Sequence, residues 1–376
     1  MSDSAERLTA ADFEAAMDLL NRAFAEHGAH DFARMLPARY QPTDGSMGHH
    51  VAIRRRGRIA ALLGIFPIEW RLGDEVLRVA GIGGVAVDPD HRGQGLMGRL
   101  LEYARDAIRD DGFHLSFLSG QRQRYLRYGW ERAGTRLRYV LHPRNLCSGP
   151  PTRPLELERP RDNDENVLRE LHDAQPTRCC RPAERFGDFL RGWNSDIWVA
   201  RTAHGTVRGY LSCSEEQESI AEVVGDSVAT SHALLRAWAT RSPRTHILRL
   251  PLSVLPLARQ LAEVAEVVSV ETSGNWWVLD WPRVAGALLA ARATMTPLPP
   301  GRVVLSVEGQ RFTLAAEGES VQCETTRQPV DLELATAAMT RLLFGPTAPE
   351  AVVPRVPAAL QGWCPLPLAL PRLDEV

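Results

Sequence analysis

The sequence contains no lysine, and all 44 of its Lys+Arg residues are arginine. This absence excludes a P-loop, a Schiff-base lysine and a lysine nucleophile, because each needs a lysine side chain. Cysteine is also scarce. Six cysteines in 376 residues are too few for a disulfide framework, and none forms a Cys-x-x-Cys pair. We therefore expect reduced thiols, a cytoplasmic location and no metal site.

Long apolar runs and an excess of charge are missing as well. The longest uncharged apolar stretch begins at Ile59 and stops at Glu69, which is too short to span a bilayer. Asp3, Glu6 and Asp12 interrupt the N-terminus, so a signal peptide is not expected. The formal net charge of −2 gives no sign of a nucleic-acid-binding surface. With 44% apolar and 24% charged residues, the composition is that of a folded soluble chain with two or three domains.

Hydrophobic periodicity divides the chain into three regions. In the first, the spacing of apolar residues predicts helices and strands in this order: helix from 13, strands 51–55, 59–67 and 76–87, helix 96–110, strand 114–118. Glycine and proline clusters at 146–154 end this region, and a mixed pattern of strands and helices follows to about 285. A proline-rich stretch at 297–301 opens the third region, which has three short strands and a predicted helix at 332–344.

The segment that is most informative about chemistry is Gly81–Leu101, GIGGVAVDPDHRGQGLMGRLL. An apolar strand leads through an acidic turn and a glycine-rich loop into a helix. Gly93 and Gly95 let the backbone turn tightly and approach a ligand closely. Free N–H groups of the loop and the positive end of the helix dipole bind phosphate, and Arg92 can add a charged contact. The segment therefore indicates a pyrophosphate site.

Two other interpretations of this segment remain open at this point. It fits a strand–turn–helix crossover whose glycines serve only tight packing. The glycines at 93, 95 and 98 also match the dinucleotide pattern GxGxxG, although no acidic residue follows at the distance that this pattern requires.

The longer string V-A-V-D-P-x-x-R-G-x-G-L-M-x-x-L-L resembles the acetyl-CoA-binding motif of the GNAT superfamily of N-acetyltransferases, whose core is Q/R-x-x-G-x-G/A. Met97 replaces the usual glycine or alanine, and Gly-Leu-Met is similar to the Eis-like (enhanced intracellular survival) branch. The resemblance implies an acetyl-CoA site. Its pyrophosphate would lie on Arg92, Gly93, Gln94, Gly95, Leu96, Met97 and Gly98, its acetyl group on Val85, Ala86 and Val87, and its pantetheine or thiol end near Ser119.

A second segment, Arg124–Glu131, resembles the Eis-like Y-x-R-F-G-Y sequence. By this resemblance Tyr125 is the general acid that protonates the departing CoA thiolate. A phenol suits this role because its pKa lies just above that of a thiol. The residue chemistry alone leaves a packing tyrosine as the alternative.

The resemblance extends to the architecture. It implies an α/β (α+β) chain with a catalytic GNAT domain at 1–147, a degenerate GNAT-like domain at 148–293 and a sterol-carrier-like domain at 294–376. It also implies that the terminal carboxylate, here that of Val376, is the base for the substrate amine. A frayed tail is the default for a terminus. However, the apolar, proline-rich segment Trp363–Leu368 favours a docked one.

The predicted function is therefore direct acetyl transfer from acetyl-CoA to a small-molecule or peptide amine, with an aminoglycoside or polyamine as a candidate. Glu26, which follows the first predicted helix, would attract a cationic amine. The alternative is a non-catalytic acyl-CoA or lipid-binding protein on the same fold, and transfer from another acyl donor is a third possibility. We expect no nucleic-acid or membrane partner. By resemblance to the Eis-like family, a homo-oligomer, specifically a hexamer, is expected.

Overall fold

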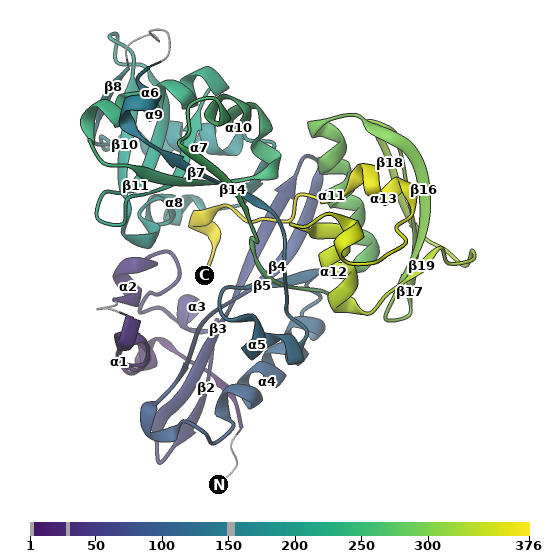
Figure 1. Cartoon of the computed structure of the whole chain (residues 1–376). Helices are drawn as coiled ribbons and strands as arrows, with labels where there is room; N and C mark the ends of the chain where they lie inside the picture. The colour runs from purple at the N-terminus through teal and green to yellow at the C-terminus, as the bar shows by residue number, and fades with distance from the viewer. Residues whose placement is uncertain (1–3, 28–30, 149–154) are drawn as a thin grey trace.

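The structure is a computed structural model that describes residues 4–27, 31–148 and 155–376. Three lobes, each built on its own sheet, surround the C-terminal segment (Figure 1). This mixed α/β architecture confirms the predicted fold class. Within the described residues, no helix has both the length and the apolar character needed to cross a membrane. All six cysteines are free thiols, and the cytoplasmic location stays a prediction.

The first sheet carries the glycine-rich segment. Its strands, in spatial order, are β1 (Glu6–Arg7), β2 (His50–Arg55), β3 (Arg58–Leu72), β4 (Glu75–Val87), β5 (Leu115–Leu118), β15 (Gly274–Val278) and β6 (Glu131–Ala133), and β9 (Thr177–Cys179) pairs with β3. The helices in this part of the chain are α1 (Phe13–Phe24), α2 (Phe32–Met35), α3 (Asp44–Met47), α4 (Leu96–Asp110), α5 (Arg122–Tyr125) and α6 (Pro143–Leu146). The predicted strands and the helix at 96–110 are confirmed, because their apolar periodicity is strong and local.

The second sheet has the order β14 (Val267–Glu271), β7 (Arg136–Leu141), β13 (His246–Pro251), β12 (Ser219–Gly225), β11 (Val207–Ser214), β10 (Asp196–Arg201) and β8 (Glu156–Glu158). Its helices are α7 (Glu165–Asp173), α8 (Phe186–Leu190), α9 (Val228–Arg241) and α10 (Leu255–Ala262). The strand β14 lies at one edge of this sheet.

The third sheet has the order β18 (Ser320–Thr325), β17 (Gln310–Gly318), β16 (Leu298–Val307) and β19 (Leu332–Glu333). Its helices are α11 (Trp281–Met295), α12 (Thr336–Phe344) and α13 (Ala358–Trp363). The helix predicted at 332–344 begins only at Thr336, so its first part was wrong. Leu332 and Glu333 instead form a strand parallel to β16, because pairing with Leu305 and Ser306 satisfies their backbone groups.

The sheets exchange strands across the predicted domain boundaries, which stay predictions. The strand β7 belongs to the second sheet, although its residues precede 147. Conversely, β9 and β15 lie in the first sheet, although their residues fall between 148 and 293. The three lobes are therefore tied together by shared sheets.

Two apolar layers cover the first sheet. On one face, α4 buries Leu96, Leu100, Leu101, Ala104 and Ile108, the stripe that the sequence predicts. Each fully buried leucine contributes about 1.5–3 kcal/mol of transfer free energy. On the other face, α1, α2 and the last residue, Val376, belong to one core with β3. The yellow C-terminal segment in Figure 1 leaves the third lobe and ends between the other two.

Candidate active site

The two central strands of the first sheet separate at one end. The strand β4 pairs in parallel with β5, and the last pair is Ile82 opposite Leu118. β5 ends there, whereas β4 continues to Val87. Among the described residues, no strand pairs with the β5 side of β4 beyond this point. The predicted acetyl-binding residues Val85, Ala86 and Val87 lie on this stretch, where the β5 side of the main chain is open to a ligand while Ala86 and Val87 still pair with β3 on the other side.

A bulge in β4 shapes the same stretch. Gly83 pairs with Gly64 of β3 and Ala86 pairs with Leu62, so two residues of β4 oppose one residue of β3. Gly84 within the bulge has φ +57°, and a Cβ there would lie 2.7 Å from the Tyr40 hydroxyl. Glycine is therefore required for both the conformation and the space.

The glycine-rich loop has the geometry expected of a phosphate site. Gly93 and Gly95 have φ +78° and +75°, and Gly95 is the N-cap of α4. Within the described residues, the backbone N–H groups of Gly93, Gln94 and Gly95 have no acceptor. Their donors and the N-terminus of α4 are thus available to an anion. The side chain of Leu96 is buried in the core below and that of Met97 is partly buried against it, so Leu96 offers a ligand only its backbone.

Arg92 and Glu26 lie together at this loop. Their side chains are largely exposed and form an ion pair with a distance of 3.3 Å between Arg92 Nη1 and Glu26 Oε1. Glu26, in η2 (Ala25–His27), is thus placed beside the phosphate loop and is not among the residues of the large pocket described below. A phosphate would compete with Glu26 for the guanidinium.

Tyr125 lies on the α4 face of the sheet, near the end of β5. It belongs to the core that includes Ile82, Leu118 and Leu96. A Cβ at Gly120 would lie 2.9 Å from the Tyr125 ring and 3.7 Å from its hydroxyl. Burial raises the pKa of the Tyr125 phenol, so the group stays protonated over the neutral range. Ser119 is exposed and directly follows β5, where the two strands separate.

The segment that carries Tyr125 is held by one buried carboxylate. Arg122 of α5 donates two hydrogen bonds to Glu131, at 2.5 and 2.7 Å. Arg341 of α12 donates a third, at 3.0 Å. Glu131 is 1% exposed, so these charge-assisted bonds fix α5 against the third lobe.

The last residue is docked against β4. Val376 is 6% exposed. A Cβ at Gly83 would lie 3.1 Å from the main-chain carboxyl carbon of Val376, and one at Gly81 would lie 2.9 Å from its side chain. Both glycines are thus needed for the close approach of the tail. Phe66 and Ile68 of β3 contact the same two positions.

Val376 and Tyr125 lie on opposite faces of the sheet. Val376 belongs to the core on the α1 face, and Tyr125 belongs to the core on the α4 face. The two groups therefore flank the strand separation from either side.

A pocket of about 600 Å³ opens beside the docked tail. Phe66 and Ile68, which contact the same glycines as Val376, are among its lining residues. Its wall carries charges of both signs: the exposed acids Glu69 and Glu184, the buried Asp374, and three arginines, Arg39, Arg181 and Arg185. This volume and partly apolar lining are typical of a small-molecule site.

Sequence reasoning missed two groups of this region. The buried Tyr40 hydroxyl beside Gly84 has no hydrogen-bond partner in the part of the chain that the structure describes. Arg39 donates to the main-chain oxygen of Asp374 at 3.2 Å. Neither belongs to a motif, and only their position in the fold brings them to the site. Among the described residues no cluster of three or more metal-ligating side chains occurs.

Comparison with known proteins agrees with this geometry. Residues 4–133 match the family model of the acetyltransferase (GNAT) domain. A search of curated proteins found no match.

Solved structures share the fold of the whole chain. The GCN5-related N-acetyltransferase from Anabaena variabilis aligns with a TM-score of 0.71 at 15% identity, over 99% of this chain and 100% of that one. The GCN5-related N-acetyltransferase from Kribbella flavida gives 0.69 at 21% identity, over 99% and 100%. Eis1 from Mycobacterium abscessus gives 0.65 at 16% identity, also over 99% and 100%.

Proposed function

Because residues 4–133 form a domain of the acetyltransferase (GNAT) family, we propose that this chain transfers an acetyl group from acetyl-CoA directly to an amine. The observation that carries the proposal is the placement of Tyr125 and Val376 on opposite faces of the strand separation. An acetyl group bound between β4 and β5 would be open to attack from one face and to loss of thiolate on the other.

In this proposal the glycine-rich loop binds the pyrophosphate of acetyl-CoA. The acceptor-free N–H groups of Gly93 to Gly95 and the guanidinium of Arg92 support this role. Ser119 at the end of β5 would meet the pantetheine or thiol end. The main-chain groups of Val85 to Val87 that face away from β3 would hold the thioester carbonyl and stabilise the oxyanion that forms on it.

The reaction then needs two proton transfers and no covalent enzyme intermediate. The amine nitrogen attacks the thioester carbon, and the carbon–sulfur bond breaks. The Val376 carboxylate takes the proton from the amine, and Tyr125 gives its proton to the CoA thiolate. The products are an amide and free CoA. Holding both substrates beside these groups supplies the rate through proximity and orientation.

For the acceptor we propose a cationic amine, such as a polyamine or an aminoglycoside, bound in the pocket beside Val376. The wall carries arginines as well, but Arg181 and Arg185 are paired with Asp374 and Asp188, and Arg39 donates to the main-chain oxygen of Asp374. Among the described residues Glu69 and Glu184 form no ion pair, so their carboxylates and the terminal one favour positive charge there. Glu26, which forms an ion pair with Arg92, is not needed to bind the amine in this pocket.

The test is thiol release from acetyl-CoA, followed with a thiol reagent across polyamines, aminoglycosides, amino acids, arylamines and peptides. We expect release with at least one cationic amine and formation of the corresponding amide by mass spectrometry. Tight acetyl-CoA binding by calorimetry with no release from any amine would instead support the non-catalytic acyl-CoA-binding alternative.

We also propose that the chain forms a homo-oligomer through the edge strand β14. Val267, Val268 and Val270 on this strand are 47%, 44% and 56% exposed. If a second copy pairs antiparallel about Ser269, Val268 of each copy lies opposite Val270 of the other. Such aliphatic cross-strand pairs stabilise a sheet, and an unpaired edge offers the hydrogen bonds. The hexamer implied by the Eis-like resemblance stays a prediction.

Replacing Val268 and Val270 together by lysine should dissociate this oligomer, because like charges would then face each other across the pair. Light scattering coupled to gel filtration would show the smaller mass. Val167→Lys, at a 36% exposed position on α7, is the matched control and should leave the mass unchanged. A wild-type chain that runs as a monomer would contradict the proposal.

A further inference from the structure

We infer that Arg181 is a positioning residue that sets the place of the Val376 carboxylate. This inference rests on the proposed function of that carboxylate as the base. It also assigns a task to the second lobe, which lacks a glycine-rich motif of its own: this lobe holds the end of the chain in the active site of the first.

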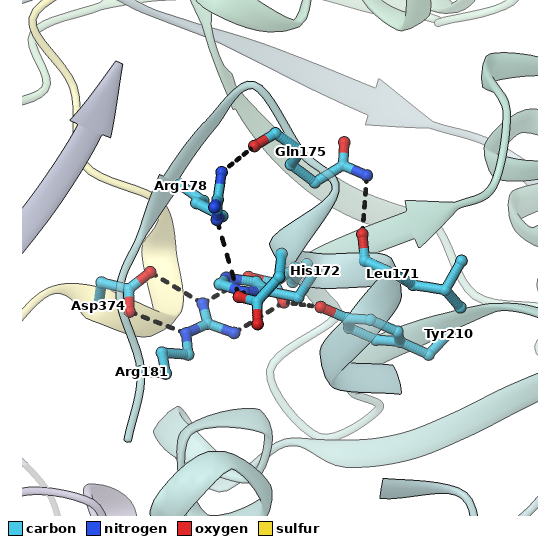
Figure 2. Close-up of polar contacts among 9 residues, drawn as sticks. Leu171, His172, Gln175, Arg178, Arg181, Tyr210 and Asp374 are labelled. Carbon is cyan, nitrogen blue, oxygen red and sulfur yellow. Dashed lines mark hydrogen bonds and ion pairs between the residues drawn. The ribbon is translucent and has the colours of Figure 1, made fainter. Parts of the chain in front are cut away.

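Arg181 binds the tail through two nitrogens of its guanidinium. Its Nε and Nη2 donate to the two carboxylate oxygens of Asp374, at 2.9 and 2.8 Å. Asp374 stands two residues before Val376, in η9 (Arg372–Asp374). Figure 2 shows the two side chains facing each other, with Asp374 on the yellow terminal segment. Such a two-point bond fixes orientation as well as distance.

The other side of the same guanidinium is anchored in the second sheet. Nη1 and Nη2 of Arg181 donate to Glu222 of β12, at 3.0 and 2.6 Å. Tyr210 of β11 donates to Glu222 at 2.6 Å. Arg181 itself follows β9, which is paired with β3 of the first sheet. The side chain thus joins three parts of the molecule: β3 through its own strand, β12 through Glu222, and the tail through Asp374.

The side chains of this cluster are shielded from solvent although Arg181 and Asp374 border the pocket beside the tail, so these bonds are strong and their loss is costly. The side chains of Arg181 and Asp374 are 0% and 1% exposed, and that of Glu222 is 11% exposed. The arginine keeps its charge because two carboxylates surround it, and Arg181 lowers the pKa of Glu222 to about 2 against the effect of burial. Removing one member of such a cluster leaves an uncompensated buried charge or an unfilled donor.

Further contacts restrict the movement of the tail on either side of Asp374. Arg136 of β7 donates to Glu375 at 2.8 Å, and Trp193 donates to the main-chain oxygen of Arg372 at 3.0 Å. Arg181 is the member of this set that is completely buried and uses all three guanidinium nitrogens. We therefore assign the main positioning role to it.

The test compares Asp374→Asn with Asp164→Asn in the full chain. Both aspartates are buried and bonded to a buried arginine, Arg181 in the case of Asp374 and Arg201 of β10 in the case of Asp164. No hydrogen bond or ion pair of Asp164 reaches residues 371–376 in the described chain. Both variants lose a charge-assisted bond of the same kind, and only Asp374→Asn loosens the tail.

For Asp374→Asn we expect kcat to fall about 10- to 100-fold with KM for acetyl-CoA within twofold, because a displacement of about 1 Å from the productive geometry costs up to 100-fold. Hydrogen–deuterium exchange of the 371–376 peptide should rise. Asp164→Asn should keep wild-type kcat and tail exchange. Arg181→Lys keeps the positive charge but lacks the planar guanidinium that bonds both carboxylates, so it should lower kcat and raise tail exchange as Asp374→Asn does. It replaces Asp374→Asn in the test if that variant does not fold.

Each outcome decides a different point. Unchanged tail exchange or unchanged kcat in Asp374→Asn and Arg181→Lys would overturn the inference. An equal fall of kcat in Asp164→Asn would also overturn it, because the effect would then be a general loss of stability. If the wild-type chain releases no thiol with any amine, the proposed function fails, and the exchange measurement still decides whether Arg181 anchors the tail.

Discussion

Tyr125→Phe should lower kcat by about 100-fold, at the low end of what general acid catalysis contributes. A thiolate is a moderate leaving group, so its protonation accelerates the reaction without being the whole barrier. The hydroxyl lies near Gly120, where the strands separate, and removal of one oxygen leaves the ring packed as before. KM for acetyl-CoA should therefore stay within about twofold, since the binding loop is untouched.

The pH profile gives this prediction a second measurement. Only the protonated phenol can act as an acid, and burial raises the pKa of Tyr125 above its ordinary value of 10.0. Activity that depends on Tyr125 should thus be full at neutral pH and decline only above about pH 10, with no such alkaline decline in Tyr125→Phe.

Tyr139→Phe is the matched control for this experiment. Its hydroxyl is buried in the second lobe and donates to the main-chain oxygen of Ala258 at 3.1 Å. This variant should cost about 1 kcal/mol of unfolding free energy and leave kcat unchanged. Equal activity of Tyr125→Phe and wild type would show that Tyr125 is a packing residue.

The sequence predicts best what depends on neighbouring residues. The segment from β4 through the loop to α4 could be placed closely, because alternating apolar residues, an acidic turn and positive-φ glycines each act locally. For Tyr125 the sequence offers only a resemblance, which implies its role, and predicts no helix at Arg122–Tyr125; the structure adds the helix and the burial of the tyrosine. The buried stripe on α4 is the one that its spacing predicts.

Contacts between distant parts of the chain could not be predicted in this way. Arg181 and Asp374 are separated by 193 positions, and nothing in either local sequence marks them as partners. Similarly, the strand β15 enters the first sheet between β5 and β6, although its residues follow most of the second lobe. Glu26 forms an ion pair with Arg92 because the fold brings η2 to the glycine-rich loop. Loop charges take their partners from the tertiary structure, which a single sequence does not reveal.

Converting the Val376 carboxylate to an amide by protein ligation should reduce kcat by about 100- to 10,000-fold, the range of general base catalysis. The amide keeps the valine side chain, which packs against Gly81, and replaces only one carboxylate oxygen. Protein whose C-terminus is confirmed at Val376 by intact mass is the reference. KM for acetyl-CoA should be unchanged, because the amide leaves the backbone N–H groups of Gly93 to Gly95 and the Arg92 side chain untouched.

Two variants separate the charge of this group from its position and its packing. Deleting Val376 moves the carboxylate back by one residue, about 3.3–3.6 Å, which is beyond hydrogen-bond reach of an amine bound at the original place. Its kcat should fall as far as that of the amide. Val376→Ala keeps the carboxylate and loses two methyl groups, at a cost of about 1–2 kcal/mol in unfolding free energy, and should retain most of kcat. If the amide and the deletion keep wild-type kcat, the amine loses its proton to another group, and the docked tail serves to close the pocket.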